Sequence, residues 1–305
     1  MFQQTIKNNI SFKGVGLHTG RIINVRISPA EADTGIVFIR KDLANVVEIK
    51  ADAAYVVGTN YATTLGRNGA SVSTVEHLLA AFYGLGVDNA EVEIDGPEIP
   101  IMDGSASDFA GMIEHAGLKR LSCPRGYIVI NKPIRVGSED KYAMLLPCIG
   151  SGFSIDYSID FSHDLLKKQS FARNLTKDIF RKEIGSARTF GFLRDVEMLM
   201  KNGLAKGGSL KNAVVLSDTD ILNEEGLRYP DEFVRHKVLD LIGDISLIGA
   251  RIIGRLKAVR SGHTLNHLLV KEILARNDAW EMRHLINADA FKRPCNSFLG
   301  KAAAV

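Results

Sequence analysis

Alternating apolar and polar positions predict several strands in the first third of the chain. Residues 23–27 place isoleucine or valine at every second position, and Pro29 ends the run. Residues 35–39 form a short apolar stretch, and residues 90–94 alternate small or branched apolar side chains with acidic ones. Patterns of this period and length are typical of strands that bury one face.

Two helices are predicted within the same region. Residues 73–82 carry apolar side chains at helical spacing, and their first four residues fit the Ser-x-x-Glu capping box. Residues 105–116 predict a second helix, which Ser105 caps and Gly117 ends. Strands and helices mixed in this way indicate an α+β unit.

The second half follows a similar plan. Residues 153–161 alternate apolar and polar side chains more regularly than any other segment, which predicts a strand. Residues 231–247 predict a long helix, residues 248–253 a strand, and residues 266–276 a further helix. We therefore expect an α+β protein of two similar α/β sandwich domains, each a sheet packed on helices. They would face each other, with the functional site at their interface.

A cluster of chain-breaking residues at 123–126 marks the predicted domain boundary. The first domain would span residues 1–124 and the second residues 125–285. Residues 286–305 would form a C-terminal tail, in which no pattern is apparent after Phe291.

One spacing recurs in both halves. Gly84 follows His77 by seven residues, and Gly243 follows His236 by seven residues. Little else aligns residue by residue, so we expect two domains of similar design rather than a close repeat.

Composition narrows the possible functions. The 305 residues include 38 basic and 35 acidic side chains, and a net charge of +3 is too small for a protein that binds nucleic acid by neutralising phosphates. The three cysteines are widely spaced, so neither a disulfide framework nor a cysteine zinc site is expected. Because neither an apolar signal segment nor a membrane-length apolar run is visible, we expect a cytoplasmic protein without membrane insertion.

Two segments carry residues that could hold a metal ion. Glu76 and His77 lie at the start of the first predicted helix, and His236 and Asp240 lie four residues apart on the long helix of the second half. Side chains four apart share one face of a helix. His77, His236 and Asp240 could thus bind zinc and leave its fourth position open, as catalytic sites do. Glu76 could then take a proton from water, and Asp244 could hydrogen-bond a ligand histidine.

Each of these residues also has a simpler interpretation. Glu76 fits the capping box, and His77 alone is typical of a surface or core histidine. The His236–Asp240 pair is typical of a solvated i,i+4 contact. His263, in a Ser-Gly-His sequence before a predicted helix, is either an acid–base group or a capping residue. Spacing alone leaves these alternatives open.

Five motifs occur in order along the chain. They are Gly-Val-Gly-Leu-His-Thr-Gly at 14–20, Ser-Thr-Val-Glu-His-Leu at 73–78, Glu-Ile-Pro-Ile-Met-Asp-Gly-Ser-Ala at 98–106, Asp-Glu-Phe-Val-Arg-His-Lys at 231–237 with Asp240, and Ser-Gly-His at 261–263. Together they closely resemble the zinc-dependent UDP-3-O-acyl-N-acetylglucosamine deacetylase family of lipid A biosynthesis, from about residue 4 to about residue 285. This resemblance outweighs the simpler interpretations, which apply to isolated residues.

The resemblance implies a zinc-dependent amidohydrolase with one catalytic ion. The zinc ligands would be His77, His236 and Asp240, and Glu76 would be the general base that activates the attacking water. The reaction would remove the N-acetyl group from UDP-3-O-[(3R)-3-hydroxyacyl]-N-acetylglucosamine, giving acetate and the free 2-amine. This is the committed step of lipid A biosynthesis.

Three further residues are implied in the chemistry. Thr189 would stabilise the oxyanion together with zinc. His263, as an imidazolium, would stabilise charge and protonate the leaving amine. Asp244 would orient and charge-stabilise either His263 or a ligand histidine, and the resemblance leaves both partners open.

The family also implies a hydrophobic passage for the 3-O-acyl chain. A βαβ insert in the second domain, here about residues 193–215, would build it. The residues expected around the acyl chain and the sugar are Leu17, Phe190, Gly208 and Ser209, with Phe161 near the nucleotide sugar.

The diphosphate of such a substrate requires cations. Lys237, beside His236, is the strongest candidate, and Lys141 is a second. Arg260 stands where relatives often carry lysine, and its planar guanidinium would bind phosphate with altered geometry.

Two alternatives stand beside this function. A zinc amidohydrolase of the same fold acting on another acylated amino sugar would have a pocket without an apolar tunnel. A non-catalytic nucleotide-binding module would bind no metal. The expected partner is a small UDP-sugar lipid rather than nucleic acid, and the protein is expected to be a monomer.

Overall fold

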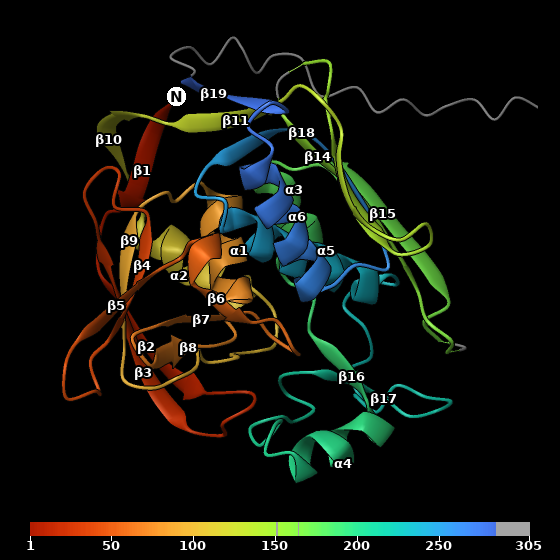
Figure 1. Ribbon diagram of the computed structural model, residues 1–305. Coiled ribbons are helices and arrows are strands. Elements are labelled where there is room, and N and C mark those ends of the chain that lie inside the picture. The colour runs from red at the N-terminus through yellow and green to blue at the C-terminus, as the bar shows by residue number, and fades with distance from the viewer. Residues whose placement is uncertain (151, 164, 285–305) are drawn as a thin grey trace, which may run out of the picture.

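The computed structural model describes residues 1–150, 152–163 and 165–284, and it has the mixed α+β architecture that the sequence predicts. Two large sheets stand on opposite sides of the molecule, and helices fill the space between them (Figure 1). The predicted tail at 286–305 lies outside the described residues. Within the described chain, no helix is long and apolar enough to cross a membrane.

The first large sheet comes from the N-terminal third of the chain. Its strand order is β2 (Ile10–Val15), β3 (Ile22–Pro29), β9 (Ala90–Ile94), β4 (Ile36–Arg40) and β5 (Val47–Lys50). The alternation predicted at 90–94 is confirmed, because Ala90, Val92 and Ile94 are buried while the acidic residues between them are partly exposed. Smaller sheets flank it: β6 (Val56–Gly58), β7 (Thr64–Arg67) and β8 (Ala70–Val72), and the pair β1 (Phe2–Ile6) and β10 (Leu118–Pro124).

The second large sheet comes from the C-terminal half. Its main strand order is β12 (Ile134–Gly137), β13 (Tyr142–Leu146), β18 (Arg251–Val259), β11 (Gly126–Ile130) and β19 (Trp280–His284). β14 (Phe153–Asp160) runs parallel to β18, and β15 (Lys168–Asn174) pairs antiparallel with β14. β14 confirms the regular alternation predicted at 153–161, since its aromatic and isoleucine side chains are buried.

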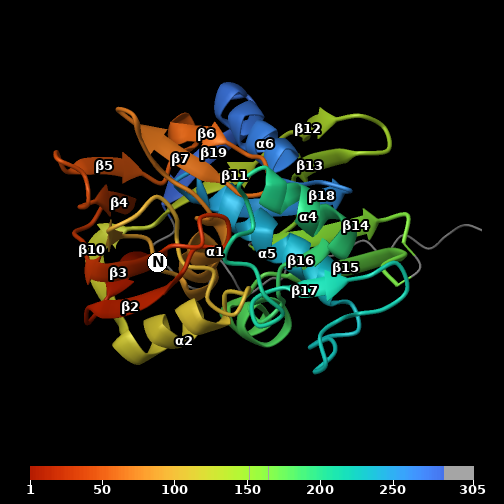
Figure 2. The ribbon, with the colours of Figure 1, turned by 90° about the horizontal axis from the view of Figure 1, so that it is seen from below.

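The helices form the layer between the sheets. They are α1 (Glu76–Leu85), α2 (Ser107–Ala116), α5 (Glu232–Ser246) and α6 (His263–Ala275), with a short α3 (Lys177–Ile179) followed by a π-helical turn at Phe180–Ile184. A 3-10 turn covers Ala53–Tyr55. Viewed from below, α1 and α5 lie next to each other in the centre of the molecule (Figure 2).

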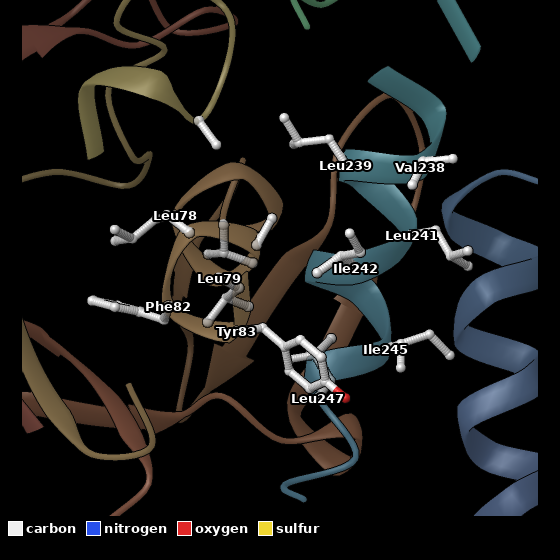
Figure 3. Packing of buried hydrophobic residues seen from close by; sticks show 14 of the residues in the cluster. Leu78, Leu79, Phe82, Tyr83, Val238, Leu239, Leu241, Ile242, Ile245 and Leu247 are labelled. Carbon is white, nitrogen blue, oxygen red and sulfur yellow. The ribbon is translucent and has the colours of Figure 1, made fainter. Parts of the chain in front are cut away.

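The core between α1 and α5 is apolar and fully buried (Figure 3). Ile242 of α5 points toward α1, where it faces Leu79, and both side chains are at most 1% exposed. Leu241 points to the other side of α5, toward α6. Burial of apolar surface stabilises a fold by about 25 cal/mol for each Å² removed from water. The packing therefore holds α1, from the first half, firmly against α5, from the second.

A third element stands apart from both sheets. β16 (Phe190–Phe192), α4 (Leu193–Lys201) and β17 (Val214–Leu216) form a parallel βαβ unit that contains the segment 193–215. α4 projects away from the main body at the bottom of Figure 1. None of its residues is fully buried.

The capping box predicted at the start of α1 is wrong. The helix begins at Glu76, and its N-cap residue Val75 makes no side-chain cap. Ser73 donates its hydroxyl to the Pro97 carbonyl, and Thr74, with a positive φ of 56°, hydrogen-bonds Glu98. Tertiary contacts have taken both hydroxyls, so Glu76 is free for another role.

Three other predicted boundaries need correction. α2 begins at Ser107, and Ala106 in the N-cap position forms no side-chain cap, although Ser105 Oγ accepts from the Ser107 amide. β18 begins at Arg251 rather than at residue 248, because a turn through Gly249 with a φ of 77° intervenes. α6 begins at His263 rather than at residue 266, so that this histidine occupies the first turn of a helix.

The packing around α5 makes a prediction about stability. Leu241→Ala should lower the free energy of unfolding by about 2–5 kcal/mol, because a cavity opens at a side chain that is 0% exposed. Leu268→Ala is the matched control, since Leu268 of α6 is 45% exposed. The control should stay within about 0.5 kcal/mol of the parent in urea unfolding. Equal losses in both variants would contradict the prediction.

Candidate active site

His77, His236 and Asp240 come together in the helical layer between the two sheets. Their candidate ligand atoms all lie within 4.8 Å of one another, and all three residues are buried. Asp240 Oδ1 lies 3.4 Å from His77 Nε2 and 3.3 Å from His236 Nε2. The two imidazole rings meet edge to face with centroids 5.0 Å apart. Segments about 160 residues apart in the sequence thus form one cluster.

Helix geometry explains how the cluster forms. His236 and Asp240 are one helical turn apart on α5 and project from the same face. His77 lies in the first turn of α1, which packs against that face. The cluster therefore depends on the contact between α1 and α5.

His236 is held as a neutral imidazole in one tautomer. Its Nδ1 lies 3.0 Å from the Ala187 carbonyl oxygen, so Nδ1 carries the proton and Nε2 presents its lone pair to the cluster. Burial lowers the pKa of His236 to about 3, despite the opposing effect of Asp240. A neutral imidazole with a fixed tautomer is the form that binds metals.

Asp240 remains ionised although it is buried. Burial raises the pKa of its carboxyl, but the positive charges of Lys237 and His263 oppose this effect, and that pKa lies well below its ordinary value. Lys237 Nζ donates to Oδ2 at 2.6 Å, whereas Oδ1 has no hydrogen-bond partner within the described chain. A buried carboxylate oxygen without a donor carries a high desolvation cost, which a cation at that point would offset.

The donor types and their spacing fit a tetrahedral zinc ion. Zinc binds histidine nitrogen and aspartate oxygen at about 2.0–2.2 Å, which places the donors of a tetrahedral site about 3.4 Å apart. The two distances from Asp240 Oδ1 to the imidazoles, 3.3 and 3.4 Å, match that spacing. Three protein ligands of this kind are typical of catalytic zinc sites, in which water or substrate takes the fourth position.

Glu76 places a second buried carboxylate next to the cluster. Its Oε2 accepts a hydrogen bond from the Thr63 amide at 3.1 Å, and its Oε1 lies 3.8 Å from His263 Nε2. Burial raises the pKa of Glu76, an effect that His263 and His77 partly oppose. A carboxylate whose pKa is raised in this way is suited to accept a proton near neutral pH.

His263 faces Glu76 from α6 and is held by Asp244. Its Nδ1 lies 2.8 Å from Asp244 Oδ2, so the structure pairs Asp244 with His263 rather than with a histidine of the cluster. Burial lowers the pKa of His263, but the charge and hydrogen bond of Asp244, together with Glu76, raise it to about 9. His263 is therefore an imidazolium at neutral pH, next to a base.

An apolar cavity of about 430 Å³ opens beside the cluster. Its lining includes five residues expected near the substrate: Leu17, Thr189, Phe190, Gly208 and Ser209. Side chains of α4 form part of the wall, namely Leu193, Val196 and Leu199. The Phe190 ring of the cavity wall lies 6.3 Å from the His236 ring, centroid to centroid, so one residue connects the wall to the cluster.

Phe190 also lies close to two other residues that were expected near the substrate. The Phe161 ring lies edge-on to it at 5.9 Å, and Lys237 Nζ lies 5.7 Å from its centroid. The other two expected cations lie elsewhere, beside the turn that joins β12 and β13. Lys141 is in this turn, and Arg260 at the end of β18 pairs with its Asp140 at 3.4 Å.

The sequence did not predict the residues that support these groups. Thr63 donates its hydroxyl to Asp244 Oδ1 at 2.6 Å, and Asn266 donates to Oδ2 at 2.8 Å. Both come from segments without a distinctive motif, so spacing holds no signal for them. Glu98 is 0% exposed and accepts from the amides of His18 and Thr19 at 2.8 Å. The signal for Glu98 in the sequence is its place between two prolines, at the start of the motif at 98–106.

Comparison with known proteins gives a consistent set of matches. A family model described as UDP-3-O-acyl N-acetylglycosamine deacetylase matches residues 3–275. The UDP-3-O-acyl-N-acetylglucosamine deacetylase of Citrifermentans bemidjiense is 50% identical over 296 residues, which cover 97% of this chain and 96% of the relative. The protein of the same name from Myxococcus xanthus is 50% identical over 280 residues, 92% of this chain and 88% of its own length. That from Pseudomonas entomophila is 48% identical over 305 residues, 99% of each chain.

The pairing of His263 with Asp244 makes a prediction about titration. Asp244→Asn removes the charge that raises the pKa of His263 while burial, which lowers it, remains. The pKa of His263 should therefore fall from about 9 by at least one unit, as measured by NMR titration of the imidazole. Asp156→Asn, which removes a carboxylate paired with Arg255 on the second sheet, should leave this titration unchanged.

The same shift sets a pH window for stability. A folded-state pKa of about 9, above the ordinary 6.5, stabilises the fold fully below pH 6.5, and this contribution is lost as the pH rises through 9. The Asp244→Asn variant should show a weaker pH dependence across that window. An unchanged His263 titration in the variant would contradict the assignment.

Proposed function

The chain belongs to the UDP-3-O-acyl-N-acetylglucosamine deacetylase family, and we propose that its buried histidine–aspartate cluster is the zinc site at which the N-acetyl group is removed from the substrate. The substrate is a UDP-3-O-[(3R)-3-hydroxyacyl]-N-acetylglucosamine, and the products are acetate and the free 2-amine. The enzyme is thus a hydrolase of a linear amide and acts in lipid A biosynthesis. The single observation that carries the assignment is the convergence of three ligand atoms within 4.8 Å, beside a buried base and a cationic histidine.

His77, His236 and Asp240 would hold the ion. A bound zinc ion supplies Lewis acidity, which polarises a carbonyl oxygen and lowers the pKa of water. Lys237 supports the site through its 2.6 Å hydrogen bond to Asp240 Oδ2, which leaves Oδ1 for the metal. The Ala187 carbonyl accepts from His236 Nδ1 and so leaves Nε2 for the metal.

Glu76 acts as the general base. It takes a proton from the water whose oxygen attacks the acetamide carbonyl carbon, and its raised pKa favours this transfer near neutral pH. The Thr63 amide binds Oε2 and so directs the carboxylate.

His263, whose Nε2 lies 3.8 Å from Glu76 Oε1, acts as the general acid. As an imidazolium it stabilises the negative charge that develops on the carbonyl oxygen, and Thr189 contributes to this stabilisation. When the C–N bond breaks, His263 gives its proton to the nitrogen, which leaves as the amine. Asp244 raises the pKa of His263 and orients its ring through Nδ1.

The apolar cavity would receive the 3-O-acyl chain. Leu17, Gly208 and Ser209 line it together with side chains of α4, and no charged residue is among its lining residues within the described chain. Phe161 and Phe190 would border the sugar nucleotide, with Lys237 at its phosphates. Lys141 of the β12–β13 turn and Arg260 at the end of β18 would provide further cations.

The proposal also covers the division into domains, the oligomeric state and the location of the protein. The two large sheets support a division into domains at residues 1–124 and 125–285, with β16, α4 and β17 as the insert that builds the acyl site. We further propose a monomer, since the three candidate ligands all come from one chain. We place this monomer in the cytoplasm.

Acetate release with metal removal tests the function directly. Purified protein should release acetate from the UDP-3-O-acyl substrate, lose this activity when a chelator strips the metal, and regain it when zinc is added back. Folded, zinc-loaded protein that releases no acetate would contradict the proposal. Release from an acylated amino sugar without UDP, and not from the UDP substrate, would favour the alternative amidohydrolase.

Two variants separate metal binding from proton transfer. Glu76→Gln should keep its zinc and lower kcat by about 10²–10⁴-fold, the usual contribution of a general base. His236→Ala should lose both zinc, measured by elemental analysis, and activity. Glu91→Gln on β9 is the matched control and should change neither quantity. A Glu76→Gln variant with nearly the parent rate would exclude Glu76 as the base.

A further inference from the structure

The recurring spacing between histidine and glycine places a glycine in both helices of the metal cluster. Gly84 lies seven residues after His77 in α1, and Gly243 lies seven residues after His236 in α5. Neither glycine has a positive φ, so backbone conformation does not require either of them. Glycine within a helix costs about 1 kcal/mol relative to alanine. Close packing is the remaining reason for a glycine at these positions.

Gly243 is in direct contact with the backbone of α1. A Cβ atom at this position would lie 2.1 Å from the Glu76 carbonyl oxygen, 2.7 Å from its carbonyl carbon and 2.8 Å from its Cα. Real Cβ atoms essentially never approach other heavy atoms within 3.0 Å. Because all three neighbours are main-chain atoms, no side-chain rotation could make room for a methyl group.

This contact lies at the metal cluster. Gly243 is three residues beyond Asp240, close to the same face of α5, and Glu76 is the residue before His77. The backbone contact therefore sets the distance between the two helices at the point where His77 reaches Asp240. Separating the helices here would move one ligand away from the other two.

We propose that Gly243 is a positioning residue for the metal centre, and this inference rests on the proposed zinc site. Its missing side chain lets α5 touch the first residue of α1, so that His77 Nε2 comes within 3.4 Å of Asp240 Oδ1. An alanine would force the two backbones apart by about 1 Å. Metal–ligand distances tolerate only about 0.2 Å.

Gly84 provides a comparison within the same interface. A Cβ there would meet the ring of Phe180 at 2.3–2.5 Å. Phe180 is also fully buried, so Gly84→Ala should disturb packing between the two halves. This contact lies at the far end of α1 from His77, and a side chain rather than a backbone must move. Gly84→Ala is thus expected to reduce stability without changing the metal site.

The test compares three glycine-to-alanine variants of the full chain. Gly111 is the neutral control, because it also lies in a helix, α2, and an added Cβ meets nothing within 4 Å. Zinc affinity is measured by competition with a chelator, and the d–d absorption of cobalt(II)-loaded protein reports ligand geometry. Urea unfolding and circular dichroism report stability and folding.

Gly243→Ala is expected to weaken zinc binding by about 10–100-fold, the usual effect of disturbing the support of a metal site, and to alter the cobalt spectrum. Gly84→Ala should unfold at lower urea concentration, yet keep the parent's zinc affinity and cobalt spectrum. Gly111→Ala should match the parent in all measurements. If Gly243 had only a structural role, Gly243→Ala would lower stability but keep the parent's zinc affinity and cobalt spectrum, as expected for Gly84→Ala.

Two results would overturn the inference. One is a folded Gly243→Ala protein with the parent's zinc affinity and cobalt spectrum. The other is a Gly243→Ala protein that does not fold even with zinc present, because the contact would then support the whole fold. If the parent itself bound no zinc, the proposed function would fail instead, so the two failures can be told apart.

Discussion

The close contact between α1 and α5 is the constraint on which the site depends. α1 comes from the first half of the chain and α5 from the second, and neither helix alone carries all three candidate ligands. Apolar side chains such as Leu79 and Ile242 hold the helices together, and Gly243 lets their backbones touch beside the ligands. The metal cluster thus forms only when the two halves are docked, so folding of the interface and assembly of the site are one event.

Two buried histidines near this interface differ in charge. His236 is buried with its Nδ1 bound to a carbonyl oxygen, and its pKa of about 3 keeps it neutral. His263 is also buried, but the carboxylate of Asp244 at 2.8 Å raises its pKa to about 9. One buried histidine is therefore neutral and can bind a metal, whereas the other is an imidazolium. The group at Nδ1, a carbonyl oxygen or a carboxylate, makes the difference.

Sequence patterns predicted what depends on neighbours along the chain. The strand at 90–94 and the long helix of α5 follow from local periodicity, and the i,i+4 pair on α5 follows from helix geometry. The capping box failed because Ser73 donates its hydroxyl to the Pro97 carbonyl, a partner that comes from a distant segment. Thr63 could not be predicted at all, since its hydroxyl meets Asp244 across 181 residues. Without the family resemblance, spacing alone could not have joined His77 to α5.

The apolar cavity is also built from both halves of the chain. The turn that carries Leu17 belongs to the first half, and buried Glu98 holds it through the amides of the two residues that follow. The insert then docks on this turn, where the Gly207 amide donates to the Leu17 carbonyl at 3.0 Å. The wall of the cavity therefore contains residues from both halves of the chain, as the candidate metal cluster does.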